Sequence, residues 1–269
     1  LKNNYYSLIN NIYKISIKLM NSITAGIIII GDEILSGRTQ DKNLNFISKN
    51  LLKEGIKLEE VVVIQDNKEI IIDRVLNYSK KYSYVFTTGG IGPTHDDITS
   101  ESISEAFNLE YQVNKDAFKI LDNYYPKGEF NESRQRMAMM PNGSELILNP
   151  MTAAPGFNIK NVYVLPGVPE IMQIMFLELI KKLKKGKPKL VITINTNLYE
   201  SKIAFFLKDI QNKYKDSSIG SYPYFNLAAK TGGVNIVVSS WNMTSVKPIV
   251  DDIVNMIKLN GGKSSIVWY

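Results

Sequence analysis

The sequence contains no cysteine, a single histidine and no long uncharged apolar run, and each of these absences excludes a class of protein. Without cysteine the chain forms no disulfide, has no thiolate nucleophile and has no cysteine metal site, which fits a reducing cytoplasm. No apolar run approaches the ~18 residues that a membrane span requires, and the chain does not open on a clean signal-peptide core. We therefore expect a cytoplasmic protein without a membrane partner.

The basic charge is spread along the chain. The net charge of +6 permits contacts with anionic ligands or nucleic acid but does not require them, because the lysines are scattered. The densest basic run, KKLKKGKPK (Lys181–Lys189), is typical of a lysine-rich helix end followed by a linker. The length of 269 residues allows two unequal domains. We expect domains at residues 23–186 and 187–269, preceded at 1–22 by an extension whose first nineteen residues are either poorly packed or an artefact of start-site choice.

Strands alternate with helices in the first of these parts. Continuous β-branched runs predict strands buried on both faces, and Asp41 and Gly55 are placed to cap the first helix. The alternation predicts βαβ units around a mostly parallel sheet. The expected strands are 25–31, 58–64, 84–90 and 161–167, and the expected helices are 41–55, 67–81, 100–107 and one beginning at Pro169, with a polar helical insertion at 111–143. The last helix is expected to bury Ile171, Ile174, Met175, Leu179 and Leu183. Residues 190–269 predict a smaller α+β unit with four strands and two helices.

Three of the expected strands end in loops of unusual composition. These loops are GDEILSG (Gly31–Gly37), TTGGIGPTHDD (Thr87–Asp97) and PGVPE (Pro166–Glu170). Ligands of open parallel sheets bind outside the carboxyl ends of the strands, so we expect the three loops to lie at one edge. Taken singly, the glycine loop is equally explained as an ordinary turn, with Asp97 or Thr99 capping the next helix. The ordinary interpretation is the better one for the other features, with Asp32 and Glu33 in a solvated turn, PGVPE as a helix start and His95 as a polar loop side chain.

Together the loops indicate a site for a phosphate or diphosphate. Gly89, Gly90 and Gly92 allow backbone N–H groups to approach an anion closely, and the helix starting near Ser100 adds its N-terminus. The carboxylates of Asp32, Glu33, Asp96 and Asp97 would repel that anion unless a divalent cation such as Mg²⁺ bridged them. We therefore predict these four residues as tentative metal ligands and catalytic residues.

Other nucleotide and catalytic motifs are absent. No G-x-G-x-x-G follows the first strand, GGKSS near the end lacks the earlier glycine of a P-loop, and no G-x-S-x-G accompanies the histidine.

The loop motifs resemble the N-terminal domain of the CinA (competence/damage-inducible protein A) family, which has the molybdopterin-binding MoaB/MogA-like fold. The resemblance is carried by GDEILSGRTQDKN (31–43), TTGGIGPTHDDIT (87–99), NPMTAAPGF (149–157) and LPGVPEIMQIMF (165–176). IGSYPY (219–224) looks like the KH-like domain that follows in that family. The resemblance implies a three-layer α/β/α domain, a small α+β KH-like domain, a pterin or nucleotide ligand, and a homodimer or other homo-oligomer. Beyond the four carboxylates, the implied ligand-binding residues are Gly31, Asn43, Thr88, Gly89, Gly90, Gly92, Pro93, Thr94, His95, Gly167 and Pro169.

The resemblance implies more than one activity. Our leading expectation is a metal-dependent hydrolase of a nucleoside-diphosphate compound, similar to an ADP-ribose pyrophosphatase. The alternatives are a molybdopterin adenylyltransferase or molybdenum-cofactor biosynthesis protein, and a non-catalytic module that binds a pterin or nucleotide.

This sequence departs from the family pattern at two positions. Ile171 stands where the family commonly has Glu, with Glu170 before it, and Ala153 replaces a threonine. Full-length members of the family carry a C-terminal amidase domain, for which this sequence has no residues after Tyr269. Nicotinamide-nucleotide deamidation is therefore not expected. Nucleic acid is not an expected partner either, because residues 190–269 contain no G-x-x-G loop.

Overall fold

The computed structural model describes residues 23–227 and 231–268. The chain divides after Gly186 into two compact units, and each is described here by itself. The expectations for residues 1–22 lie outside the described residues. Within the described part of the chain, no helix is long and apolar enough to cross a membrane.

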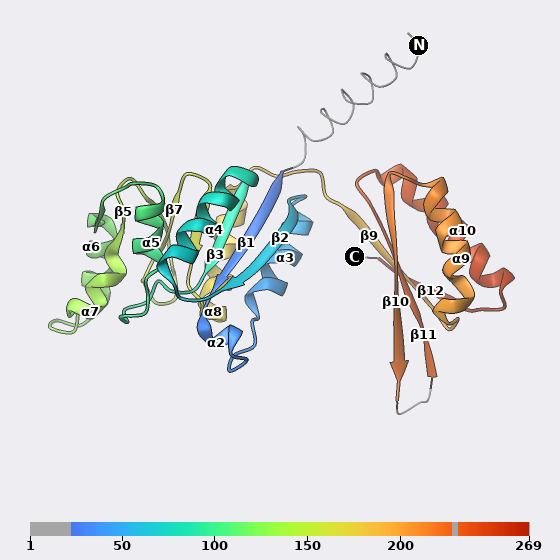
Figure 1. The fold of residues 1–269 in the computed structure, drawn as a ribbon, viewed down its shortest axis with the longest axis horizontal. Helices are drawn as coiled ribbons and strands as arrows, with labels where there is room; N and C mark the ends of the chain where they lie inside the picture. The colour runs from blue at the N-terminus through green and yellow to red at the C-terminus, as the bar shows by residue number, and fades with distance from the viewer. Residues whose placement is uncertain (1–22, 228–230, 269) are drawn as a thin grey trace, which may run out of the picture. The chain divides into compact units, whose positions relative to one another are not determined.

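A six-stranded sheet forms the centre of the first unit (Figure 1), in the order β2-β1-β3-β8-β7-β6. Strands β2, β1, β3 and β8 are parallel to one another. At one edge, β7 pairs antiparallel with β8 and β6 pairs antiparallel with β7, an arrangement that the sequence did not predict. The expected α/β class with a mostly parallel sheet is thus confirmed. The strands are β1 (Thr24–Ile30), β2 (Lys57–Ile64), β3 (Tyr84–Thr88), β6 (Glu145–Ile147), β7 (Gly156–Ile159) and β8 (Val162–Leu165).

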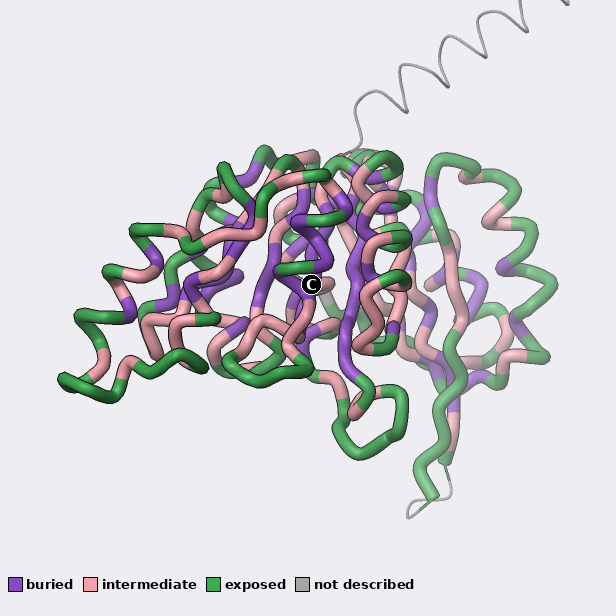
Figure 2. Tube along the Cα trace, turned by 60° about the vertical axis from the view of Figure 1, so that its left-hand side comes forward, coloured by how far each residue is buried: buried purple, intermediate pink, exposed green. Residues whose placement is uncertain are grey.

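Helices cover both faces of this sheet and make it three-layered. Successive side chains of β1 point to opposite faces, so Ile28 and Ile30 join one core cluster while Ile27 and Ile29 join the other. Helices α4 and α5 contribute to the first cluster, and α3 and α8 contribute to the second. Figure 2 shows the buried strands enclosed by helices with exposed outer surfaces. The helices are α3 (Asn43–Lys53), α4 (Lys68–Lys81), α5 (Thr99–Ala106) and α8 (Pro169–Lys182).

The residues at the two ends of α3 have the roles that the sequence predicted for them. Asp41 Oδ1 accepts a hydrogen bond from the Leu44 N–H at 2.8 Å, and Gly55 ends α3 with a φ of +69°. In α8, the predicted buried stripe is confirmed for Met175, Leu179 and Leu183 and was wrong for its first two members. Ile171 and Ile174 are only half-buried, whereas Met172, Phe176 and Ile180 are buried with Met175, Leu179 and Leu183.

Two segments differ from the predicted secondary structure. The loop after β1 contains a short helix, α2 (Asp32–Leu35). The insertion at 111–143 is not wholly helical, because its two ends pair as an antiparallel ribbon. Its elements are β4 (Tyr111–Val113), α6 (Lys115–Tyr124), α7 (Glu132–Gln135), the 3₁₀ helix η1 (Arg136–Ala138) and β5 (Met139–Pro141).

The second unit is α+β, as expected. Its antiparallel sheet has the order β10-β11-β9-β12, and its core joins Ile194 and Ile236 of the sheet to Ile203 and Ile253 of the helices. The elements are β9 (Leu190–Thr196), α9 (Glu200–Lys213), β10 (Ser217–Asn226), β11 (Thr231–Ser240), α10 (Met243–Leu259) and β12 (Ser264–Trp268).

The core beneath α8 provides a test of the packing. Phe176 is fully buried and meets the Phe86 ring edge-on, with ring centroids 5.3 Å apart. Phe176→Ala is therefore expected to lower the free energy of unfolding by about 3–5 kcal/mol. The control is Leu177→Ala on the same helix, whose side chain is 41% exposed, and which should change it by less than about 1 kcal/mol. Urea titration followed by circular dichroism measures both, and equal losses would contradict the assignment of the buried face.

Candidate functional site

The loops at the carboxyl ends of the parallel strands enclose a cavity of about 520 Å³. Segments following β1, β2, β3 and β8 all reach it, together with the loop between β6 and β7. The structure therefore brings together the three loops that the sequence singled out. Nine of the predicted site residues line the cavity: Gly31, Glu33, Gly89, Gly90, Gly92, Asp96, Asp97, Gly167 and Pro169.

Six predicted residues do not line the cavity: Asp32, Asn43, Thr88, Pro93, Thr94 and His95. Several of them hold the loops in place. The Asn43 side-chain Nδ2 donates to the Gly167 carbonyl at 2.8 Å, which ties the start of α3 to the third loop. The Asn43 Oδ1 and the Thr88 hydroxyl are buried without a hydrogen-bond partner among the described residues.

The Asp96–Asp97 pair is organised by Thr94. The Thr94 N–H donates to Asp97 Oδ2 at 2.8 Å, and the Thr94 hydroxyl lies 2.5 Å from both Asp96 Oδ1 and Asp97 Oδ2. The Thr94 hydroxyl is the main reason why the pKa of Asp96 lies below its usual range, and the charges of His95 and Arg136 add to the effect. Both aspartates therefore help to shape the loop that carries them.

The alternative reading, in which Asp97 or Thr99 caps α5, is wrong. The residue before α5 is Ile98, and no side chain bonds to the first turn as a cap. Thr99 instead donates its hydroxyl hydrogen to the Gly89 carbonyl at 3.1 Å, which fixes the glycine loop against the helix.

Asp66 lines the cavity but was not predicted. It lies two residues after the end of β2, and its Oδ2 accepts a hydrogen bond from the Asp32 N–H at 2.9 Å. Burial raises the pKa of Asp66, with additional repulsion from Asp32, Glu33 and Asp96, while the bond from the Asp32 N–H lowers it. Asp66 could have been predicted from the sequence, because QDN (65–67) follows a parallel strand at the same sheet edge.

The loop between β6 and β7 forms a further wall that was absent from the predicted site. Asn149, Thr152, Ala154 and Pro155 line the cavity, although the motif containing them carried the family resemblance. Asn149 fixes this loop, since its Oδ1 accepts from the Thr152 N–H at 3.1 Å and its Nδ2 donates to the Ala154 carbonyl at 2.9 Å.

The carboxylates do not gather into a metal centre. Across residues 23–227 and 231–268, no three His, Asp or Glu side chains are placed so that they could hold a metal ion. The cation expected from Asp32, Glu33, Asp96 and Asp97 stays a prediction, and Asp32 does not line the cavity.

Backbone N–H groups supply the positive side of the cavity. In the described structure, no hydrogen bond engages the N–H groups of Gly90, Ile91 and Gly92, all of which line it. The N-terminus of α8 also faces the cavity through Val168, Pro169 and Ile171, and no side chain caps it. Free amides and an open helix N-terminus favour an anion.

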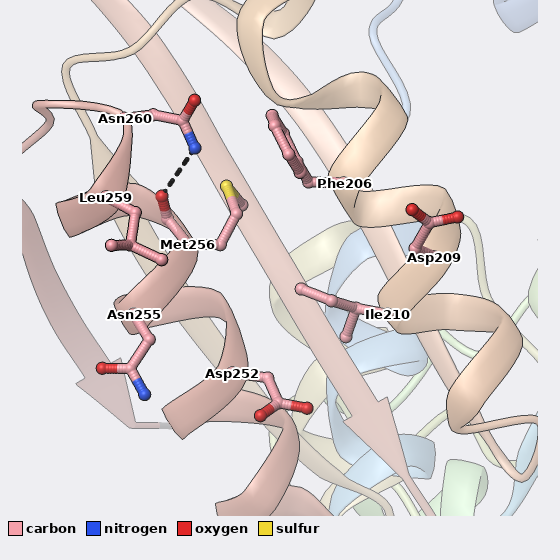
Figure 3. A pocket seen from close by; sticks show the side chains of 8 residues that line it. All are labelled: Phe206, Asp209, Ile210, Asp252, Asn255, Met256, Leu259 and Asn260. Carbon is pink, nitrogen blue, oxygen red and sulfur yellow. Dashed lines mark hydrogen bonds between the residues drawn. The ribbon is translucent and has the colours of Figure 1, made fainter.

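A second cavity, of about 460 Å³, lies in the smaller unit between α9 and α10 (Figure 3). Phe206, Ile210 and Met256 line it, with Asp209 and Asp252. Asp252 is already engaged, since its Oδ2 accepts from Lys213 Nζ at 2.7 Å and from the Tyr214 hydroxyl at 2.9 Å. None of the predicted site residues lies there.

Comparison with known families covers both units. Residues 26–185 match the model described as a probable molybdopterin binding domain, and residues 188–262 match the model described as the middle domain of FAD synthase.

Individual relatives agree with these matches. A protein of Archaeoglobus fulgidus is 35% identical over 83% of this chain and 93% of its own length. A probable FAD synthase of Caenorhabditis elegans is 33% identical over 74% of this chain, and the match spans 44% of that relative. The crystal structure of a CinA protein of unknown function from Thermoplasma acidophilum is 30% identical, with a TM-score of 0.57 over 60% of this chain and 98% of that chain.

These comparisons correct the leading functional expectation. Matches to a molybdopterin-binding domain, to the FAD synthase middle domain and to a probable FAD synthase indicate cofactor biosynthesis or nucleotidyl transfer. The prediction of a metal-dependent phosphoanhydride hydrolase similar to an ADP-ribose pyrophosphatase was therefore wrong. The residues did not distinguish the two chemistries, because both require a phosphate-binding loop with acidic neighbours.

The glycine loop provides a test of the cavity's geometry. A Cβ on Gly89, whose φ is +105°, would lie 2.1 Å from the Ile30 carbonyl oxygen, so Gly89→Ala must displace a strand end. We expect a loss of about 3 kcal/mol in the free energy of unfolding. A Cβ on Gly167 would lie 3.4 Å from its nearest neighbour, an ordinary contact, so Gly167→Ala should be tolerated. Thermal unfolding of both variants measures the difference, and a stable Gly89→Ala protein would contradict the close approach.

The raised pKa of Asp66 predicts how stability depends on pH. Since the pKa lies above 3.8 in the folded protein, ionisation of Asp66 opposes folding. Asp66→Asn keeps an acceptor for the Asp32 N–H and removes the charge. The variant should therefore be more stable than the wild type at about pH 7. This advantage should shrink as the pH falls through the folded pKa and vanish below about pH 3.8.

Urea titrations at several pH values measure this advantage. The control is Asp122→Asn, at an exposed position on α6, which should show no such trend. A variant less stable than the wild type at neutral pH would refute the prediction.

Proposed function

This chain belongs to the CinA-type, MoaB/MogA-like family of molybdopterin-binding domains, and we propose that it transfers a nucleotidyl group to a phosphorylated pterin or flavin during cofactor biosynthesis. The ligand binds in the cavity at the carboxyl ends of the parallel strands. The proposal is supported by the molybdopterin-binding and FAD synthase matches, which cover the first and second units respectively.

The observation that carries the proposal is the set of free backbone donors at this cavity. One cavity of about 520 Å³ is lined by Gly90, Ile91 and Gly92, whose N–H groups form no hydrogen bond in the described structure, and by the uncapped start of α8. Such donors bind phosphate oxygens without any change in protonation. The volume lies in the range of roughly 300–1,000 Å³ that is usual for ligand sites.

The reaction is a substitution at phosphorus. A phosphate oxygen of the acceptor attacks the α-phosphorus of a nucleoside triphosphate, the bond to the β-phosphate oxygen breaks, and pyrophosphate leaves with that electron pair. The protein's contribution is to hold the two anionic groups in line and to stabilise charge on the phosphate oxygens. The amides of the glycine loop and the N-terminus of α8 perform this role.

A divalent cation fits this site if it arrives with the phosphates. Mg²⁺ is commonly held by one or two carboxylates together with substrate phosphates, and Asp66 and Asp96 both line the cavity. These two residues would hold the ion, which would neutralise phosphate charge when bound.

The proposal is tested by acceptor-dependent release of pyrophosphate. Purified protein is incubated with ATP, GTP or CTP and Mg²⁺, with molybdopterin or FMN as the acceptor. We expect pyrophosphate release only with an acceptor, and a rate about 10- to 100-fold lower in Asp66→Asn. Asp66→Asn is suitable because its expected stability excludes unfolding as the cause of a loss.

The control variant is again Asp122→Asn, which should match the wild type. Tight binding of a pterin or nucleotide without turnover under any metal would show instead a non-catalytic binding module. Turnover unaffected by Asp66→Asn would remove this residue from the site.

A further inference from the structure

We propose that Arg136 binds a phosphate group of the nucleotide at the rim of the cavity and so positions it for the transfer. This inference rests on the proposed function, since it assigns a role in that same site to a residue from the insertion at 111–143.

The charged side chains that line the cavity are all negative, so a polyanionic ligand meets no cationic side chain among them. The lining includes the carboxylates of Glu33, Asp66, Asp96 and Asp97, and no lysine, arginine or histidine. Backbone amides offset part of this negative charge, but they carry only partial charges. A cationic side chain at the rim would therefore strengthen the binding of a triphosphate, in addition to any cation that arrives with it.

The fold places Arg136 beside the cavity. The next residue, Met137, lines the cavity, and Ala138 is fully buried with its carbonyl accepting from the Asn114 N–H at 2.9 Å. The 3₁₀ helix η1 is thus anchored at one end in the core. Arg136 stands at the other end of η1, where it is exposed and directly precedes the lining residue Met137.

Arg136 has a free guanidinium, unlike its neighbour Arg134. Arg134 stacks over the Tyr125 ring at 4.2 Å, and its Nη1 donates to the carbonyl and the carboxylate of Glu129. Within the described residues, Arg136 forms no hydrogen bond or salt bridge and is exposed. An arginine fork matches two phosphate oxygens at once, which makes a free guanidinium next to an anion site an effective phosphate ligand.

The test compares binding of ATP and adenosine by isothermal titration calorimetry. Arg136→Gln is expected to weaken ATP binding by about 10- to 100-fold and to leave adenosine binding unchanged. Arg136→Lys should fall between, because lysine retains the charge but not the fork. The charge-matched control is Lys119→Gln on the exposed side of α6, which should bind both ligands like the wild type. Unchanged thermal unfolding of Arg136→Gln shows that a loss of binding is local.

The outcomes separate this inference from the function on which it rests. If the wild type binds ATP and Arg136→Gln binds it equally well, the role of Arg136 is overturned and the proposed function stands. Equal weakening of ATP and adenosine would also overturn it, because a phosphate contact cannot act on adenosine. If the wild type binds none of ATP, GTP and CTP, the proposed function fails and the role of Arg136 fails with it.

Discussion

The backbone of Gly89 passes so close to the Ile30 carbonyl oxygen that any side chain at this position would collide with the end of β1. The Gly89 N–H also donates to the Leu165 carbonyl at 3.1 Å, at the end of β8. Three neighbouring strand ends therefore meet at one glycine. The loops that leave these three strands therefore have fixed starting points at the cavity.

The acidic side chains and the backbone amides have different roles at this edge. Asp97 accepts from the Thr94 N–H, and Asp66 accepts from the Asp32 N–H, so each carboxylate satisfies a backbone donor of a loop. The amides of Gly90–Gly92 have no such partner in the described structure. The carboxylates thus help to define the shape of the loops, while the unsatisfied donors are the groups that a ligand can bind. An anion is the ligand that such donors favour.

The elements that the sequence predicted correctly are those set by local physics. The β-branched run of β1 and the caps at Asp41 and Gly55 depend on residues near in sequence. The first half of the buried face of α8 was misplaced because Ile171, Met172 and Ile174 are all apolar there, so that hydrophobicity alone does not select the most buried of them.

The missing parts of the site depend on pairings that no local pattern indicates. Met137 reaches the cavity only because β4 and β5 pair, with Tyr111 opposite Pro141, and return the insertion to the sheet edge. Asp66 is a different case. Ligand sites at the carboxyl ends of parallel strands are expected after β2 as well as after the other strands. A single aspartate in QDN, without neighbouring glycines, is nevertheless also typical of an ordinary turn.

The correction of the function depends on the same distinction between groups that shape the loops and groups that can bind a ligand. Hydrolysis was favoured because four carboxylates in two pairs imply a cation that activates water. In the structure, these carboxylates do not all converge on one point. Asp32 donates its N–H to Asp66 and does not line the cavity. The features that remain, free amides and an uncapped helix start, stabilise charge on phosphate whichever nucleophile attacks. They are therefore compatible with nucleotidyl transfer as well as with hydrolysis, and the matches to a molybdopterin-binding domain and to FAD synthase favour the former.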